Sequence, residues 1–473
     1  MNWRVIFKSF KNKEMLKRIL GVLGIVVVFR FLAHIPVPLA EPTQLKDIIM
    51  QTLGSTDFGG IMNMLSGGAL ASFSIVLVGL SPYITASIVT QLLTKAIPKL
   101  EELHKDGESG RRKINQATRI ITLPLAIVQS IAFIFILRET VLSGSGALGD
   151  MDLFQWFTAV TAMTAGSVLL MWLGETITEK GIGNGISLLI FGGIISQLPS
   201  TLGTIWTSLT TFGEGEALNV FNWFTVPINA EVFYIVAIVA LLALLVLYTL
   251  VKINEAQRIV TINYAKRVRG NTVYGGIKSI LPIKLITAGV IPVIFAVAFL
   301  ALPAFLGQLL IASGNEGFKA FGESLVVWFQ SPNAAQAIAY GTLDWTAAIY
   351  PVCYFLLVVF FTYFYTSIVF NSNEIAENLQ RQGGFIEGVR PGKQTENYLK
   401  RTVNRLTLFG SFALGIIAVL PFAFEYIFAV LGVNVGSLAI GGTGLLIVVS
   451  VALESLRQIN SRALMVTYDD FEE

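Results

Sequence analysis

Long runs of apolar residues recur along this chain and constrain its fold more than any other feature. Each run is long enough to cross about 30 Å of hydrocarbon as an α-helix. Of the 473 residues, 54% are hydrophobic and only 13% are charged, whereas about a quarter of the residues in soluble domains are charged. We therefore predict an all-α membrane protein that crosses the bilayer many times, because helices satisfy their own backbone hydrogen bonds in lipid.

The apolar runs predict ten transmembrane helices within one polytopic domain, residues 1–473. The predicted spans are 17–36, 73–94, 119–138, 154–173, 184–199, 232–252, 281–303, 347–370, 405–423 and 436–457. Five spans on each side of the loop 200–231 permit two inverted five-helix halves, approximately 1–200 and 231–473. Two of the connecting loops, 253–280 and 371–404, are long.

Positive charge is concentrated in alternate loops, which predicts the orientation in the membrane. Clusters of Lys and Arg precede the first span and occupy the loops near 105–113, 266–269 and 390–401, whereas the opposite loops hold only Lys46 and Lys319, with Arg138 at a boundary. By the positive-inside rule, both termini and both long loops are expected in the cytoplasm. Residues 1–18 are amphipathic and basic with no small-residue cleavage site after the first apolar run, so we expect that span to be retained.

Two glycine-containing segments break the pattern of simple spans. Gly59 to Ser72 is apolar and uncharged but too short to cross, and it contains four glycines. We interpret it as a half-helix or re-entrant segment, which requires protein or a water-filled cavity around it. Gly181 to Gly185 places a flexible turn before the fifth span, where it allows close backbone approach. Both segments indicate an internal cavity.

A polar segment, Gly383 to Thr395, lies between the eighth and ninth spans. A phosphate-binding loop requires Gly five residues before its second Gly and Ser or Thr directly after its Lys. Here Glu387 and Gln394 occupy those positions, so direct nucleotide binding is not expected. A solvated turn between helices and a surface for docking a protein both remain open.

Catalytic and metal-binding patterns are absent from the sequence. Cys353 is the only cysteine, His34 and His104 are distant in sequence, and no HExxH motif occurs. We expect no enzyme activity, no cofactor and no metal. Ionisable residues are scarce within the spans, which disfavours an ion-coupled transporter; Arg30, Glu175 and Glu454 lie toward span ends, where snorkelling or local pairing explains them.

Several motifs, in order along the whole chain, resemble the SecY family, the channel subunit of the Sec protein translocon. The motifs are Asn63–Leu70, Ser81–Ile88, Gly107–Lys113, Gly181–Ser187, Asn263–Arg267, Ile291–Pro292, Gly383–Thr395 and Gly441–Thr443. The resemblance implies ten helices in two inverted halves around an hourglass pore. It also implies a lateral gate to lipid between the second and third spans on one side and the seventh and eighth spans on the other. It implies a channel that passes unfolded secretory polypeptides across the bacterial cytoplasmic membrane and releases transmembrane segments sideways.

The resemblance also assigns residues to parts of the channel. It places the pore ring at Leu80, Ile84, Ile186, Ile190, Ile294 and Ile447, where Leu80 and Ile84, like Ile186 and Ile190, share a helix face. It places the plug at Gly59, Ile61, Met62, Asn63, Met64, Leu65, Ser66, Gly67, Gly68, Ala69 and Leu70. We expect polar gate residues at Thr85, Ser87, Gln91, Gln129 and Thr287. An aliphatic ring disfavours hydrated ions by dewetting.

Transport energy must then come from partners, because the chain contains no motor of its own. The resemblance implies the ribosome or the ATPase SecA at the two long loops, the subunits SecE and SecG, signal-bearing polypeptide substrates and membrane lipid. The expected partner-binding residues are Arg258, Lys266, Arg267, Arg269, Arg390, Pro391, Gly392 and Lys393.

Two positions depart from the family pattern. Ile259 follows Arg258 where relatives commonly have a second Arg, and Ile286 stands where the gate of relatives often has Asn. A secondary transporter, supported only by inverted halves and broken helices, and an insertase scaffold remain as alternative functions.

Overall fold

The computed structural model describes residues 13–38, 66–70, 72–138, 152–210, 217–220, 224–264, 267–269, 272–274, 278–313, 316–329, 346–430 and 442–469. Its helices are α2 (Lys13–Leu32), α5 (Ser81–Ala96), α6 (Pro98–Lys105), α7 (Glu108–Leu137), α8 (Leu153–Lys180), α9 (Gly185–Thr210), α10 (Ala230–Glu255), α11 (Ile291–Ala312), α12 (Glu316–Phe329), α14 (Thr346–Val369), α15 (Ser372–Arg381), α16 (Lys393–Val430) and α17 (Gly442–Asp469). Its strands are β1 (Ala217–Val220), β2 (Phe224–Asn229), β3 (Gln257–Tyr264), β4 (Arg267–Arg269), β5 (Thr272–Tyr274), β6 (Lys278–Lys284) and β7 (Gly384–Ile386).

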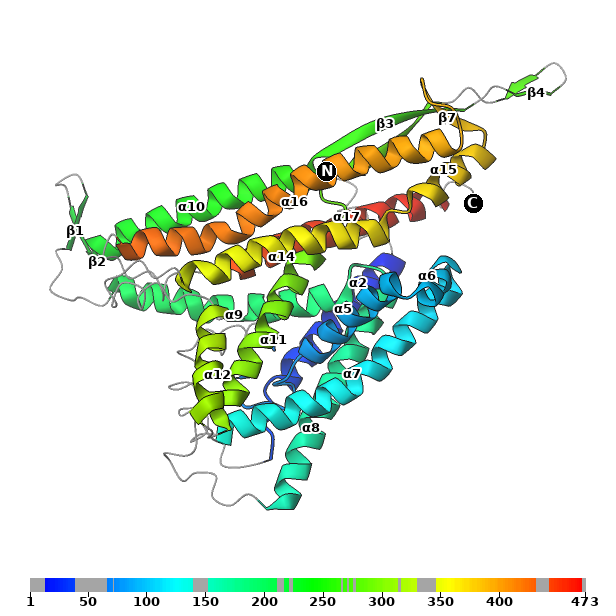
Figure 1. Cartoon of the computed structure of the whole chain (residues 1–473). Helices are drawn as coiled ribbons and strands as arrows, with labels where there is room; N and C mark the ends of the chain where they lie inside the picture. The colour runs from blue at the N-terminus through cyan, green and yellow to red at the C-terminus, as the bar shows by residue number, and fades with distance from the viewer. Residues whose placement is uncertain are drawn as a thin grey trace. The chain divides into compact units, whose positions relative to one another are not determined.

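The predicted mostly helical membrane fold is confirmed, and a helix overlaps each predicted span (Figure 1). Within the described residues, seven helical segments have the length and composition needed to cross a membrane. They are Arg112–Leu137, Leu153–Lys180, Gly185–Thr210, Val232–Glu255, Ile291–Ala312, Ala348–Arg381 and Lys393–Phe424.

The structure corrects the start of two predicted spans. The second span, predicted from residue 73, becomes helical only at Ser81. The backbone before it bonds instead to the turn that follows α2: Val37 N donates to Phe73 O (2.9 Å) and Ile75 N to Ile35 O (3.0 Å). The seventh span, predicted from residue 281, begins at Ile291. Residues 278–284 instead form β6, whose apolar side chains resemble a span in sequence.

The residues divide into two compact units. One comprises 1–239, 297–351 and 422–473, and the other 240–296 and 352–421. In the first unit α5 packs on α7, α7 on α8, α8 on α9, and α9 on α17. One buried cluster in this unit joins the turns before α5 to α7 and α8; its fully buried members include Leu77, Phe133 and Met163.

The turn between α8 and α9 confirms the expected close approach of backbones. Gly181 ends α8 with φ of 71°, in the left-handed region that favours glycine. A Cβ on Gly185 would overlap the carbonyl of Gly174 in α8. The two helices therefore meet at backbone distance around this turn.

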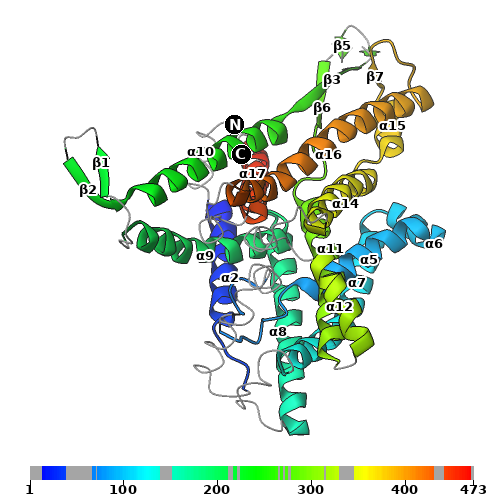
Figure 2. The same cartoon turned by 60° about the vertical axis from the view of Figure 1, so that its left-hand side comes forward.

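The second unit joins both long loops into one small sheet. Its strand order is β6-β3-β7 and both pairs are antiparallel, with Val260 opposite Leu281 and Ile262 opposite Ile386 (Figure 2). Beneath the sheet lies a buried cluster of apolar side chains from β3, β6, β7 and the start of α16: Val260, Ile283, Ile386, Leu399 and Val403. The two loops thus share a hydrophobic core of their own.

This core predicts the effect of a single truncation. Leu399 is fully buried, so Leu399→Ala should cost about 2–5 kcal/mol through lost burial and a residual cavity. Trypsin digestion of the reconstituted protein should then cleave the loops after Arg381 and Lys393 at least tenfold faster, since about 1.4 kcal/mol corresponds to a tenfold change in the open population.

The matched control is Leu408→Ala on the same helix, where the side chain is 53% exposed. This variant should be cleaved at the rate of the unchanged protein. Equal cleavage rates for both variants would contradict a shared loop core.

Candidate functional site

The segment Arg390 to Thr395 is held in one shape by local contacts. Thr395 is buried, and its Oγ1 donates a hydrogen bond to the carbonyl oxygen of Arg390 at 2.9 Å. Gly392 has φ of 96°, where a side chain would be strained, and α16 begins at the next residue. The segment therefore presents the exposed Arg390 side chain to solvent from a fixed backbone. The hydroxyl of Thr395, which the sequence did not single out, supplies this support.

The sheet exposes a charge and apolar side chains on different faces, because consecutive residues of a strand alternate between faces and Arg258 pairs with the buried Ile283. Arg258 is exposed, as expected of a partner-binding residue. The neighbouring Ile259 is 54% exposed, and Ile280 on β6 is 61% exposed. The departure at residue 259 therefore places an apolar residue, instead of a cation, on a solvent-facing strand.

The structure places the other expected partner-binding residues as follows. Pro391 and Lys393 are exposed beside Arg390, and Gly392 is partly exposed. Arg267 and Arg269 lie in β4, which pairs with β5 as a separate hairpin. Lys266 lies outside the described residues.

The aliphatic residues assigned to the pore ring are enclosed by protein. In the first unit, Leu80, Ile84, Ile190 and Ile447 are almost fully buried, and Ile186 is partly buried. Ile294 is buried within the second unit. Leu80 directly precedes α5, Ile84 lies in its first turns, and Ile447 lies near the start of α17.

Part of the segment assigned to the plug is tied to the end of α2. The guanidinium Nη1 of Arg30 donates a hydrogen bond to the carbonyl oxygen of Gly67. The hydroxyls of Ser72 and Ser74 donate to the carbonyl oxygens of Ala33 (2.6 Å) and Leu32 (2.7 Å). Local pairing therefore accounts for the charge of Arg30 within the first span.

The sequence predicted either a half-helix or another re-entrant segment here, and the described residues do not form a half-helix. Residues 66–70 form turns instead of a half-helix, with Ser66, Ala69 and Leu70 buried. Gly67 adopts φ of 69° above the ring of Phe29, where a Cβ would clash. The predicted plug residues Gly59, Ile61, Met62, Asn63, Met64 and Leu65 lie outside the described residues.

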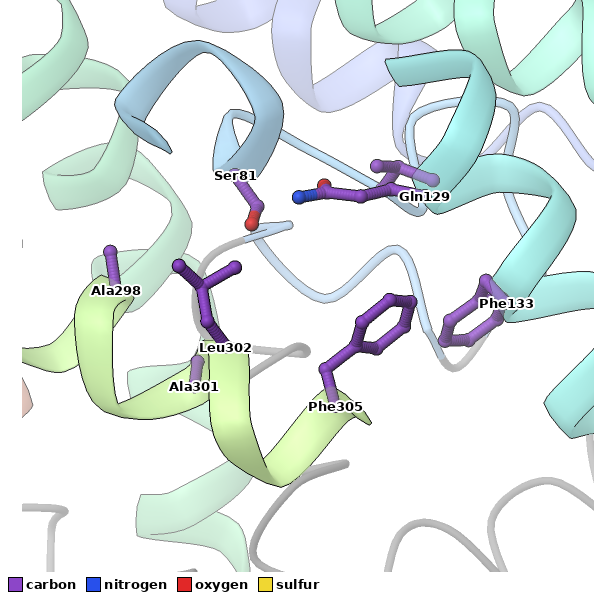
Figure 3. Close-up of a pocket in the computed structure, with 8 residues that line it drawn as sticks. Ser81, Gln129, Phe133, Ala298, Ala301, Leu302 and Phe305 are labelled. Carbon is purple, nitrogen blue, oxygen red and sulfur yellow. The ribbon is translucent and has the colours of Figure 1, made fainter. Parts of the chain in front are cut away.

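Three of the expected gate helices, α5, α7 and α11, line a pocket. Figure 3 shows Ser81 and Gln129 on one side of it, with Leu302 and Phe305 of α11 on the other. Its empty volume is about 380 Å³, open space included. The remaining lining residues are apolar: Val78, Phe133, Ala298 and Ala301.

The other expected gate residues lie outside this pocket. Gln91 Nε2 donates to Ser87 Oγ at 3.0 Å, while its buried Oε1 has no hydrogen-bond partner within the described chain. Thr85 Oγ1 donates to the Ser81 carbonyl (3.0 Å) and Thr287 Oγ1 to the Lys284 carbonyl (3.2 Å). The structure therefore groups Gln129 with Ser81, which the gate prediction omitted, and pairs Gln91 with Ser87.

Glu175 has a partner that the sequence reasoning missed. Its Oε1 accepts a hydrogen bond from Arg119 Nε at 2.8 Å, joining α8 to α7. The two residues are 56 positions apart, so no local spacing rule could have paired them.

Comparisons with known proteins identify the family. The SecY family matches residues 74–456. The protein translocase subunit SecY of Streptomyces galbus is 38% identical over 470 residues, and that of Corynebacterium glutamicum is 37% identical over 475 residues; each match covers 98% of both chains.

Solved structures share the fold. A structure described as that of a protein conducting channel matches with a TM-score of 0.56. A structure of a SecY protein, described by the role of its plug domain, matches with a TM-score of 0.59. Each is 20% identical to this chain, and each match covers 93% of this chain and 90% of the other. Sec61 in the canine ribosome-channel complex matches with a TM-score of 0.51 and 19% identity over the same shares. The chain belongs to the SecY family.

Proposed function

We propose that this protein is the channel subunit of a protein translocase, which passes unfolded polypeptides across the membrane and releases transmembrane segments into lipid. The observation that carries the proposal is the buried aliphatic set Leu80, Ile84, Ile190 and Ile447 within a membrane-spanning helical bundle. Such a set closes a pore to hydrated ions without binding a passing chain tightly. Relatives of similar length are named translocase subunits.

The proposed setting is the bacterial cytoplasmic membrane, with both termini and the joined loops in the cytoplasm. The distribution of Lys and Arg between loops supports this orientation. SecE and SecG are the proposed membrane partners. SecA or a translating ribosome would bind the joined loops, and a Sec61 relative solved in a ribosome-channel complex supports the ribosome as one such partner.

Arg390 is the proposed main contact for these cytoplasmic partners. It is exposed on a segment fixed by the Thr395 hydrogen bond and by the start of α16. Its planar guanidinium offers five donors that fit carboxylate, phosphate or carbonyl groups better than a Lys ammonium does. The exposed Ile259 and Ile280 would add an apolar contact on the neighbouring sheet.

Reconstituted transport tests the function and this contact together. Vesicles holding the protein with its partner subunits should protect a signal-bearing polypeptide from external protease when SecA and ATP are added. Arg390→Glu should lower the protected fraction at least tenfold, because reversing a charged contact removes a hydrogen bond worth about 1.5–3 kcal/mol and adds repulsion.

Two controls accompany this experiment. Arg381→Glu changes an exposed Arg on α15 whose nearest carboxylate, Glu377, is 3.7 Å away, and it should leave protection near the unchanged level. Assembly with partner subunits should survive in both variants. A polypeptide that stays fully digestible with the unchanged protein would refute the channel, whereas full protection with Arg390→Glu would refute only the contact.

The aliphatic set makes a separate prediction about ion leakage. Ile84→Asn or Ile447→Asn should favour the open pore by removing about 1.5–3 kcal/mol of apolar burial from the closed state. Resting conductance in planar bilayers should therefore rise tenfold or more. The matched control is Val89→Asn, since Val89 is exposed on the same helix as Ile84. Conductance that is unchanged in both buried variants would contradict the pore ring.

The hydrogen bond from Arg30 to Gly67 is proposed to hold the base of the plug against α2. Arg30→Met would remove a charged hydrogen bond worth about 1.5–3 kcal/mol to the closed state. Resting conductance should rise and transport should tolerate weaker signal sequences. Arg30→Lys keeps the positive charge and a hydrogen-bond donor group, so it should show a smaller change. A closed channel in the Arg30→Met variant would exclude this role.

The pocket between α5, α7 and α11 is the proposed place where a gate opens toward lipid. Ser81 and Gln129 give its wall polar groups among apolar neighbours (Figure 3). A polar group on an otherwise apolar contact weakens closure, because its hydrogen bonds to water are lost when the gate closes. The buried, apolar Ile286 would strengthen closure relative to an amide at that position.

A further inference from the structure

The short helix α12 packs tightly against the end of α11. A Cβ added to Gly322 would lie 2.7 Å from the carbonyl oxygen of Gly307, and one added to Gly307 would lie 2.8 Å from that of Gly322. No side chain fits at this crossing, so the two backbones are in direct contact. Figures 1 and 2 both show the helices side by side.

The contacts around this crossing establish that α12 runs back along α11. Gly322 faces Leu310 and Ile311, whereas Gly307 faces Leu325 and Val326. Later residues of α12 thus meet earlier residues of α11, which is itself long and apolar enough to span a membrane. At 14 residues, or about 21 Å, α12 cannot cross the bilayer, so it would enter and end within it.

The charged residues of α12 are all near its N-terminus, as expected if its C-terminal end lies deeper in the bilayer. Glu316, Lys319 and Glu323 all lie in its first eight residues, at spacings of three and four that place them on one side. The final residues, 325–329, are all apolar. The C-terminal end of α12, which runs deepest along α11, therefore carries no charge. The charged residues of α12 lie beside the C-terminal end of α11.

The opposite side of α12 is aromatic and exposed. Phe318 is 55% exposed, Phe321 56% and Trp328 40%. At about 100° per residue, these three side chains point away from the side that carries the three charged residues. Leu306 of α11 is also 55% exposed, so apolar exposure extends from the spanning helix to its neighbour.

We propose that α12 is a re-entrant helix inserted into one leaflet, with Phe318, Phe321 and Trp328 in contact with lipid. Lipid is the occupant because the aromatic face continues the apolar surface of a membrane span, and because aromatic rings are favoured near the membrane interface. The charged side faces water or headgroups. The distribution of Lys and Arg places this helix in the leaflet away from the cytoplasm.

Spin labels on the two sides of α12 test the proposal. Cys353 is the only cysteine, so a Cys353→Ala background accepts one new cysteine at a time. Phe321→Cys and Trp328→Cys mark the aromatic side, and the matched controls Lys319→Cys and Glu323→Cys mark the charged side. The full complex is labelled in vesicles of phosphatidylethanolamine and phosphatidylglycerol, and collision rates with oxygen and a water-soluble nickel chelate are compared.

The oxygen-to-nickel ratio should be several-fold higher at residues 321 and 328 than at 319 and 323, and highest at 328, which lies deepest. Equal, water-like ratios at all four positions would overturn the proposal. Labels at 321 and 328 that neither reagent reaches would also overturn it, because a protein partner or a second copy would then cover this face. None of these changes alters residues assigned to the pore, so transport by the labelled protein separates this test from that of the proposed function.

Discussion

Backbone polar groups near the hydrocarbon must find partners within the protein, and this constraint governs how the chain before α5 is held. Spanning helices meet it by themselves. The turns before α5 cannot, so their groups bond to the chain that follows α2: Val37 N donates to Phe73 O and Ile75 N to Ile35 O. Arg30, Ser72 and Ser74 complete the same connection through side chains. Irregular backbone is thus tolerated beside the spans because the end of α2 and the turn after it supply its partners.

The joined loops follow a different constraint, because they lie outside the spans. Water satisfies their exposed backbone, so their order depends on burying apolar side chains. Ile262 pairs with Ile386 across β3 and β7, and Leu399 lies in the cluster beneath them. The proposed docking surface therefore has a hydrophobic core of its own. The hydrogen bond from Thr395 holds the backbone of Arg390 locally.

Ionisable side chains near the spans are stabilised by specific partners. Arg30 bonds a carbonyl of the segment assigned to the plug, and Glu175 pairs with Arg119 between α7 and α8. A charged side chain in lipid is costly unless it has a partner. The bond to that partner holds the two structural elements together. These contacts join elements that are distant in sequence, and the sequence alone could assign them only to snorkelling or local pairing.

The sequence by itself determined the membrane class, the approximate spans and the motifs that identify the family, because hydropathy, loop charge and glycine spacing act locally. Even Gly181 could be assigned to a close turn from its position. Tertiary structure decided what depends on partners: that residues 278–284 pair as a strand, that Ile75 bonds to the turn after α2, and that Gln129 shares a pocket with Ser81. It also decided that α12 folds back on α11 through Gly307 and Gly322. An apolar run has the same composition in a span, a strand or a re-entrant helix, and only its neighbours distinguish them.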